Sequence, residues 1–351
     1  DTIPDLVVAE GNSNKVALFM GLGGGSFAPA VEYASRPFPF GLVVADFNGD
    51  GKTDVAATCQ TSGYVNVWLG DGNGALGPRA DILLGGGPGG LAAGDFDKDG
   101  DLDLVCTWPQ TFSSSLKVLA NSSLGVFTLA TSVPTNDDPT SVGVADVNMD
   151  GDPDLVVALN NWSGNLAVHF GGHGISFGAI QQYDGSDDTY AVAVGDLTGE
   201  GFPDAVTVGS RSCAVFLNRG AGYFGPNVAT CALDVPRRIG TGRLNGDATD
   251  DIAVVASAHD TVEVFYSAGS GSLTAGPLLG VGAGPSDVEV VDINLDSYAD
   301  IVSANYLGSF SVYLGTAGGT FVRKPDVSIS TGGWGLAVKD LNHDGLPDVA
   351  V

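Results

Sequence analysis

The stretch "DFNGDGKTD" (residues 46–54) carries an oxygen-bearing side chain at its first, third, fifth and ninth positions and glycine at its sixth. Oxygen ligands at alternate positions of a tight loop are typical of calcium sites, because calcium takes about six to eight oxygen ligands. Glycine at the sixth position permits the sharp turn that such a loop needs. A single copy would fit a metal-free turn equally well, since Asp, Asn and Gly favour turns without an ion.

The same pattern recurs along the whole chain. Successive copies begin 47 to 51 residues apart, a regularity that chance does not produce. The seven copies are "DFNGDGKTD" from Asp46, "DFDKDGDLD" from Asp95, "DVNMDGDPD" from Asp146, "DLTGEGFPD" from Asp196, "RLNGDATDD" from Arg243, "DINLDSYAD" from Asp292 and "DLNHDGLPD" from Asp340. A fixed period of this length indicates a repeat architecture in which each copy belongs to one structural unit.

Short apolar runs surround the loop in each unit. A run such as "GLVVA" (41–45) precedes the loop, one such as "DLVVAL" (154–159) follows it, and one such as "VNVWLG" (65–70) comes third. A glycine-rich turn then leads to a fourth, less regular run. Runs of this length, rich in Val and bounded by Gly, Asp and Asn, are typical of strands. Seven units of four antiparallel strands predict an all-β fold, a seven-bladed β-propeller that forms a single domain over residues 1–351.

The two ends of the chain predict how the ring closes. The N-terminal "DTIPDLVVAE" (1–10) supplies a second strand without its first, and the C-terminal "GLAVKDLN" (335–342) supplies a first strand. Pairing them would remove the exposed edges, whereas a linear solenoid, the alternative, usually needs polar capping repeats. The segment "DVAV" (348–351) is a further second strand that competes with "DLVV" (5–8). This competition leaves open a continuation of the chain past Val351.

The sequence argues against two alternative roles for the acidic loop. An EF-hand requires an acid at position twelve and a following helix. Position twelve here is Ala57, Cys106, Val157 or Val351 in four of the copies, each within a predicted strand. A glycosidase pair of carboxylates is needed only once, so sevenfold repetition argues against it.

Six of the seven copies are therefore predicted to bind calcium, about five to six ions in all. The Asp196 copy carries Thr198 and Glu200 and is expected to bind more weakly, and the Asp292 copy has Ser297 in place of glycine. The predicted ligands are Asp46, Asn48, Asp50, Asp54, Asp95, Asp97, Asp99, Asp103, Asp146, Asn148, Asp150, Asp154, Asp196, Thr198, Glu200, Asp204, Asp292, Asn294, Asp296, Asp300, Asp340, Asn342, Asp344 and Asp348.

The fifth copy departs from this pattern. Arg243 occupies position one, while Asn245, Asp247 and Asp251 keep their oxygens. A guanidinium at this position could pair with the carboxylates in place of an ion. This loop is therefore predicted to be empty.

The units resemble the FG-GAP and VCBS repeats of integrin α-subunit-type seven-bladed propellers. The residues that carry the resemblance are "VADFNGDGKTDVA" (44–56) and the turns "LGGGSFAP" (22–29) and "YFGPN" (223–227). The resemblance covers essentially the whole chain. It implies calcium between strands one and two of a blade, a secreted or cell-surface setting, and ligand recognition by the opposite face. It implies no particular substrate, since such repeats occur in adhesins, lectins and accessory domains of enzymes.

The strand order predicts which residues share the face opposite the acidic loops. Connections between strands two and three, and between blades, emerge there, and they carry Trp108, Trp162, Tyr306, Trp334 and "ASRPFPFG" (34–41). Aromatic side chains on loops suit stacking against carbohydrate or contact with a protein partner. The alternative is that these rings only cover the ends of the blades. The four tryptophan and tyrosine residues are the predicted ligand contacts.

Composition disfavours two kinds of interaction, binding to nucleic acid and insertion into a membrane. The chain has 41 acidic and 14 basic residues, a formal net charge of -27, which disfavours nucleic acid as a partner. It has no run of about 18 apolar residues that would insert into a membrane. Cys213 and Cys231 flank a hairpin-like stretch and could face each other, although the sequence does not decide whether they are bonded. Cys59 and Cys106 lie in apolar runs and are predicted to be buried thiols.

These observations favour a calcium-stabilised extracellular binding or adhesion propeller that recognises a glycan or an extracellular protein. Catalysis is the less favoured class: the alternative is a polysaccharide lyase or hydrolase, or its accessory module, with a site at the mouth of the central channel. A structural module of a surface or filament assembly is the third hypothesis. The ligand and the oligomeric state are not determined by the sequence.

Overall fold

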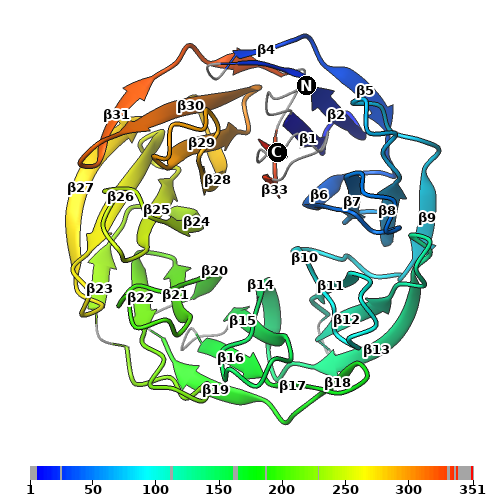
Figure 1. Cartoon of the computed structure of the whole chain (residues 1–351), viewed down its shortest axis with the longest axis horizontal. Coiled ribbons are helices and arrows are strands. Elements are labelled where there is room, and N and C mark those ends of the chain that lie inside the picture. Colours follow the sequence, from blue (N-terminus) through cyan, green and yellow to red (C-terminus); the bar gives the residue numbers. More distant parts are fainter. Residues whose placement is uncertain are drawn as a thin grey trace.

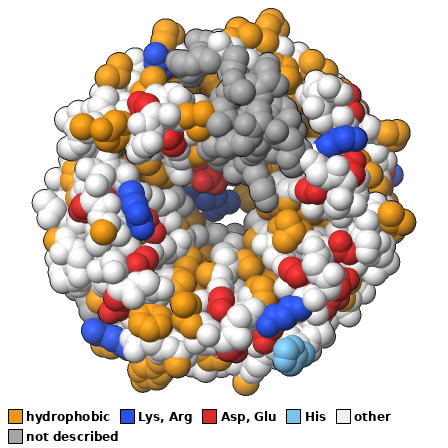
Figure 2. Space-filling model, viewed as in Figure 1, with side chains coloured by type: hydrophobic (Ala, Val, Ile, Leu, Met, Phe, Trp, Pro, Cys, Tyr) orange, Lys and Arg blue, Asp and Glu red, His pale blue; other side chains and the backbone are white. Residues whose placement is uncertain are grey.

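The computed structural model describes residues 6–23, 26–110, 114–160, 165–185, 188–227, 229–329, 333–335, 337–338 and 349–350. Over these residues the chain is all-β, with antiparallel blades arranged in a ring (Figure 1). The space-filling view shows a central channel along the axis of this ring (Figure 2). The first blade shows the pattern: its strands are β6 (Pro39–Ala45), β7 (Asp54–Cys59), β8 (Tyr64–Trp68) and β9 (Ala80–Leu83). The described part of the chain contains no helix that could cross a membrane.

Five further blades repeat this order from the channel to the rim. They are β10 (Leu91–Gly94), β11 (Asp103–Trp108), β12 (Ser115–Ala120) and β13 (Thr128–Pro134); β14 (Asp138–Ala145), β15 (Asp154–Asn160), β16 (Asn165–His169) and β19 (Gln181–Asp184); β20 (Thr189–Gly195), β21 (Asp204–Gly209), β22 (Ser212–Phe216) and β23 (Ala229–Ala232); β24 (Pro236–Gly242), β25 (Asp251–Ala256), β26 (Thr261–Ser267) and β27 (Leu273–Gly280); and β28 (Pro285–Val291), β29 (Asp300–Asn305), β30 (Ser309–Thr316) and β31 (Thr320–Arg323). Short additions are β3 (Gly21–Gly23) with β4 (Ser26–Phe27), β17 (Gly171–Gly172) with β18 (Ser176–Phe177), and β32 (Val327–Ser328) beside β30.

The seventh blade closes the ring with both ends of the chain. Its order is β33 (Ala337–Val338), β34 (Val349–Ala350), β1 (Leu6–Glu10), β2 (Lys15–Phe19) and β5 (Val31–Ala34). The C-terminal β34 pairs in parallel with β1, so closure of the ring by the two ends of the chain is confirmed. The direct pairing of the C-terminal first strand with the N-terminal strand is wrong, because β33 pairs with β34, which lies between them. The described parts of the two competing second strands lie side by side in this sheet, so neither displaces the other.

The core lies between the blades. All residues of second strands β7, β21, β25 and β29 are buried, as expected for strands covered on both faces. One apolar cluster joins Val206 and Val215 of one blade to Ile252 and Val254 of the next. The second residue of each described acidic loop is also apolar and buried. These residues are Phe47, Phe96, Val147, Leu197, Leu244 and Ile293.

The structure settles the state of the cysteines. Cys213 and Cys231 lie opposite each other on β22 and β23 and are joined by a disulfide. Cys59 and Cys106 are free and buried, as predicted, and burial raises the pKa of each thiol to about 12. Neither buried thiol is reactive at neutral pH.

Candidate functional site

The acidic loops connect strand one to strand two in each blade and therefore share one face of the propeller. Their ninth residue, an Asp, begins the second strand and is fully buried in every loop that the structure describes. In the first loop, Asp54 Oδ2 accepts the N–H of Phe47 at 2.9 Å, and Oδ1 accepts the N–H of Gly70 at 2.8 Å. This carboxylate thus ties the loop to the residues that follow strand three. Desolvation raises its pKa to about 6, although the two N–H groups act in the opposite direction.

The same arrangement occurs in the other described loops. Asp251 accepts the N–H groups of Leu244, Asn245 and Ser267 at 2.8–3.1 Å. Burial raises the pKa of Asp300 to about 7, and that of each other member to about 6. The further members are Asp103, Asp154 and Asp204. Position nine therefore has a structural role that needs no ion.

Position one is the part of the loop that fits a cation. Asp46 Oδ2 accepts the N–H of Gly51 at 2.9 Å, but Oδ1 is buried without a hydrogen-bond partner, as is Asp95 Oδ1. A buried carboxylate oxygen without a partner is costly unless a cation or donor faces it. Asp95, Asp97 and Asp99 offer oxygens that lie within 4.8 Å of one another. These groups are suitable ligands for calcium.

Position six accounts for the glycine in the motif. Its backbone lies in the left-handed region, at φ 81° in Gly51 and 72° in Ser297, and this conformation directs the N–H to the position-one carboxylate. Ser297 donates to Asp292 Oδ2 at 2.7 Å, so a residue other than glycine is accommodated there. In the Asp196 loop, Asp196 Oδ1 accepts N–H groups from Gly199 and Glu200, so this oxygen is already engaged.

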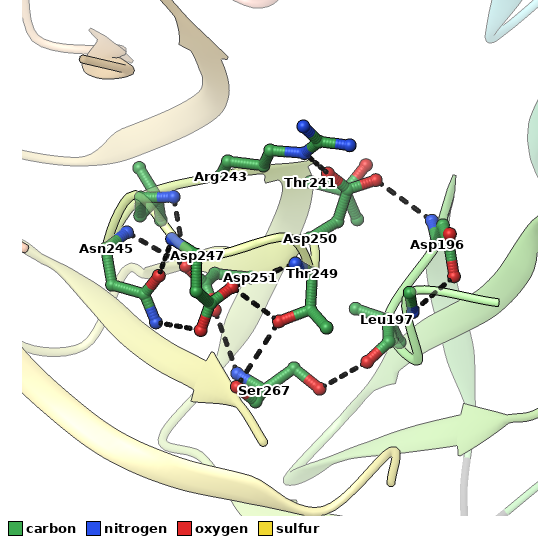
Figure 3. Close-up of polar contacts among 12 residues, drawn as sticks. Asp196, Leu197, Thr241, Arg243, Asn245, Asp247, Thr249, Asp250, Asp251 and Ser267 are labelled. Atoms are coloured by element: carbon green, nitrogen blue, oxygen red, sulfur yellow. Dashed lines mark hydrogen bonds and ion pairs between the residues drawn. The ribbon is translucent and has the colours of Figure 1, made fainter. Parts of the chain in front are cut away.

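The fifth loop differs from the predicted pairing (Figure 3). Arg243 Nε lies 3.9 Å from Asp250 Oδ1, and its side chain points away from Asn245, Asp247 and Asp251, with which it was expected to pair. Asp250, at position eight of the same loop, is tied to the neighbouring blade, because its Oδ2 accepts the N–H of Asp196 at 2.9 Å. Ala248, at position six, does not adopt a positive φ. This loop therefore lacks both the position-one carboxylate and the N–H that it would accept.

Two groups of predicted site residues lie outside the described residues. One is the Asp340 loop, with Asp340, Asn342, Asp344 and Asp348, and the other is Trp162.

The opposite face contains a cavity of about 670 Å³ at the mouth of the central channel. It is formed where first strands begin and second strands end, so every blade contributes. The residues that line it, called the channel mouth below, are Phe40, Gln60, Gly89, Thr107, Pro109, Asp138, Pro139, Thr140, Asn160, Tyr190, Arg237, Arg238, Ser257, Gly284, Pro285, Ser286, Tyr306 and Trp334.

A β-bulge shapes the channel mouth. The pairing of strand one with strand two shifts at the same end of β6, β14, β20, β24 and β28. In β24 the shift lies between Pro236 and Ile239, where two residues oppose one. Successive residues of a regular strand point to opposite faces, and a bulge relaxes this alternation and re-aims side chains. Neighbouring residues such as Arg237 and Arg238 therefore both line the cavity.

Aromatic rings gather at one side of the channel mouth. The Trp334 ring centroid lies 4.9 Å from that of Tyr306 and 5.9 Å from that of Phe40. Phe38 also packs on Trp334, at 5.7 Å. Two of the predicted ligand contacts, Tyr306 and Trp334, thus lie together. Trp108 does not line the cavity: its Nε1 donates to Gly85 O at 3.0 Å, and Lys117 covers its ring at 4.1 Å.

Among the described residues that line the inside of the channel, the charged side chains come from two adjacent blades, β24–β27 and β28–β31. Residues five places before each acidic loop face a second cavity, of about 160 Å³, within the channel. These seven residues are Gly41, Gly90, Ser141, Ala191, Arg238, Asp287 and Gly335. Glu289 lines the same cavity, and desolvation, followed by repulsion from Asp287, raises its pKa to about 8. Figure 2 shows acidic and basic side chains within the central opening.

Arg237, Arg238, Asp287 and Glu289 were not predicted as site residues. The sequence does distinguish two of them: when the seven units are aligned, Arg238 and Asp287 occupy a position that is Gly, Ala or Ser in the other units. This difference points to a site only once the seven equivalent positions are known to face one channel.

Comparisons with known proteins agree with this architecture. The sequence model of the FG-GAP-like repeat matches residues 1–57, 46–106, 95–157, 243–303 and 292–351, which together exceed half of the chain. The unmatched region contains the altered Asp196 loop. A search of the curated proteins found no matching relative.

Several solved structures share the fold. A lectin from Agrocybe aegerita, described as recognising non-reducing terminal N-acetylglucosamine, is 18% identical with a TM-score of 0.62, over 93% of this chain and 90% of that one. The periplasmic gluconolactonase of Pseudomonas aeruginosa is 15% identical with a TM-score of 0.71, over 94% and 97%. A protein from Lactobacillus plantarum is 13% identical with a TM-score of 0.70, over 94% and 98%. At these identities the likeness concerns the fold alone.

Proposed function

Because the chain belongs to the FG-GAP-like repeat family, we propose that it is a ligand-binding propeller whose site is the channel mouth. The observation that carries this proposal is the cavity of about 670 Å³, to which every blade contributes. Its volume lies within the range of about 300–1,000 Å³ that is usual for small-molecule sites. Its position at the channel axis also lets a ligand contact several blades at once.

A glycan is the ligand class that this lining fits best. Trp334, Tyr306 and Phe40 offer apolar ring surface, and sugar rings present C–H faces that stack on such surfaces. Gln60 and Asn160 place amide groups at the same mouth, where they can exchange hydrogen bonds with hydroxyl groups. The existence of a lectin with the same fold supports sugar recognition as a role for a propeller of this shape.

Calcium in the acidic loops is part of the proposal. The orphaned oxygens of Asp46 and Asp95 support it, as does the convergence of Asp95, Asp97 and Asp99. The position-one, -three, -five and -nine side chains would hold the ion, and its charge would neutralise the carboxylates that each loop brings together. In this proposal about five to six ions stabilise the face away from the ligand.

A secreted or cell-surface location is also part of the proposal. Disulfides persist in oxidising compartments and are rare in the cytosol, and Cys213 is bonded to Cys231. Extracellular calcium would also keep weak loop sites occupied.

Binding to an array of glycans tests the proposal. We expect selective binding that is weakened about tenfold by Tyr306→Ala or Trp334→Ala, since buried aromatic contacts often dominate such interfaces. Trp108→Ala is the matched control, because Trp108 lies outside the cavity. An array without any bound glycan, together with self-association that rises with protein concentration, would instead support a structural module.

Catalysis in the second cavity, within the channel, is the second candidate. Glu289 is a carboxyl group within the channel whose pKa is raised to about 8, a value suited to a general acid at neutral pH. The shared fold with a gluconolactonase is compatible with a sugar-derived substrate. Turnover of a lactone or polysaccharide that is abolished by Glu289→Gln would establish this candidate, and binding without turnover would reject it.

A further inference from the structure

We propose that the channel mouth selects an anionic saccharide, with a carboxylate of the ligand held by Arg237 and Arg238. This inference rests on the proposed glycan-binding function and specifies its ligand class. Its starting point is the distribution of charge. The chain carries a formal net charge of -27, yet two of its 14 basic residues stand side by side at the channel mouth. Asp138 is the acidic residue in the same lining.

The bulge in β24 makes the arginine pair possible. Adjacent residues of a regular strand project to opposite faces, which would send one of the two guanidinium groups into the space between blades. The register shift between Pro236 and Ile239 inserts an extra residue at this point. Both arginines consequently line one cavity. Local backbone geometry therefore brings two guanidinium groups to one cavity of an acidic protein.

Arg238 is held in position by its surroundings. Its Nη1 donates to Tyr190 O at 3.3 Å, and its guanidinium carbon lies 5.6 Å from the Phe40 ring centroid. Nε lies 4.0 Å from Asp287 Oδ1, the limit of an ion pair. These contacts leave further N–H donors of the five-donor guanidinium available. A guanidinium fixed in this way loses little side-chain entropy when a ligand arrives.

Arg237 is the more solvent-accessible of the two arginines. It is exposed, and its Nε donates to Ser257 Oγ at 3.4 Å. Among the described residues no carboxylate lies within 4.0 Å of its guanidinium nitrogens. A planar carboxylate matches the fork geometry of a guanidinium, and such charge-assisted bonds are about twice as strong as neutral ones. The aromatic rings of Tyr306 and Trp334 lie in the same cavity and can support the sugar ring.

The chemistry that this arrangement recognises is a uronate residue. A sugar carboxylate would contact the arginines, and the ring that carries it would rest on the aromatic side. A neutral sugar would leave the Arg237 guanidinium unused. Selectivity is therefore expected for the charged member of a pair of saccharides that differ only at the carboxyl group.

Calorimetry with matched oligosaccharides tests this inference. The probes are oligomers of galacturonate, glucuronate and mannuronate, each with its carboxyl-reduced neutral counterpart. We expect at least one uronate oligomer to bind at least about tenfold more tightly than its neutral counterpart, because hydrogen bonds to charged groups contribute about 1.5–3 kcal/mol. Arg237→Gln and Arg238→Gln should each remove most of that preference. Lys324→Gln, which makes the same change of charge outside the cavity, should preserve it.

The outcomes separate the two proposals. Equal binding of charged and neutral oligomers, or a preference that both arginine variants retain, overturns the arginine assignment and leaves glycan binding intact. Binding of neutral glycans alone has the same consequence. If no uronate oligomer and no arrayed glycan binds, the inference and the proposed function both fail. Arg237 is exposed, so Arg237→Gln remains informative even if Arg238→Gln perturbs folding.

Discussion

At one end of the propeller the same residue types stand at the same positions in blade after blade, whereas at the other end equivalent positions differ. The acidic loops repeat a buried Asp at position nine, and its two oxygens accept backbone N–H groups in each described copy. In the channel next to the channel mouth, Arg238 and Asp287 occupy a position that is Gly in three blades. Repetition is what a shared scaffold requires, while one asymmetric ligand requires different side chains around the axis.

Removal of calcium should produce the largest effect and would test the scaffold half of this comparison. A site held at a hundred times its Kd contributes about 2.7 kcal/mol, so several sites together exceed the effect of any single substitution. We expect EDTA to lower the Tm by well over 10 °C, as measured by calorimetry.

Two variants test whether the calcium-dependent gain in Tm comes from the acidic loops that are expected to bind the ion. Asp97→Asn should reduce the calcium-dependent gain in Tm, because Asp97 converges with Asp95 and Asp99. Asp247→Asn, in the loop with Arg243, should leave the gain unchanged. An unchanged Tm in EDTA, or equal losses in the two variants, would contradict the calcium assignment.

Loss of a position-nine carboxylate should have the next largest effect. Asp251→Ala removes the acceptor of three buried N–H groups in the loop that is expected to hold no ion. We expect a loss of about 3 kcal/mol in the free energy of unfolding, with or without calcium, because buried N–H groups without partners are costly. Urea denaturation measures it. The exposed Asp247→Ala is the control, and a loss below about 1 kcal/mol would reject the structural role of position nine.

Local repetition is what made the scaffold predictable. The spacing of the acidic loops and the Val-rich runs beside them depend on near neighbours in sequence, so strands, blades and closure followed from the pattern. The N–H bonds that Asp54 accepts from Phe47 and Gly70 were not predictable in this way, because Gly70 is distant in sequence and reaches Asp54 only after strand three pairs.

The channel mouth was predictable only in part. Strand order placed Tyr306 and Trp334 on the face that carries the channel mouth, because antiparallel strands alternate their ends. Trp108 was grouped with them, yet it packs against Gly85 and Lys117, which depends on side-chain direction. The bulge that brings Arg237 and Arg238 together depends on strand register, which no single run of sequence specifies.

Rebuilding the irregular loop should give an effect of intermediate size. Arg243→Asp with Ala248→Gly restores the position-one carboxylate and lets position six adopt a positive φ, as in the other described loops. We expect the double variant to gain about 2–3 kcal/mol of stability in calcium and none in EDTA. Arg243→Asp alone should gain less, since the position-six N–H would still point elsewhere. Equal stability with and without calcium would show that position one does not determine binding.

The smallest expected effect concerns Glu289 and would sharpen the account of the channel. Burial, followed by the charge of Asp287, raises its pKa from 4.5 to about 8, and Arg238 also faces the same cavity. A carboxyl whose pKa is raised by folding contributes stability that is present below about pH 4.5 and is lost as pH rises through 8. Glu289→Gln should therefore match the parent near pH 4 and exceed its stability by about 1–2 kcal/mol above pH 8, which is less than the full shift implies because the side chain is only partly buried. Urea denaturation across this pH range, with Asp138→Asn at the channel mouth as control, measures the difference. A variant that is less stable than the parent at high pH would mean that the Glu289 carboxylate is stabilised by Arg238, and that the asymmetric charges of the channel serve the fold as well as the ligand.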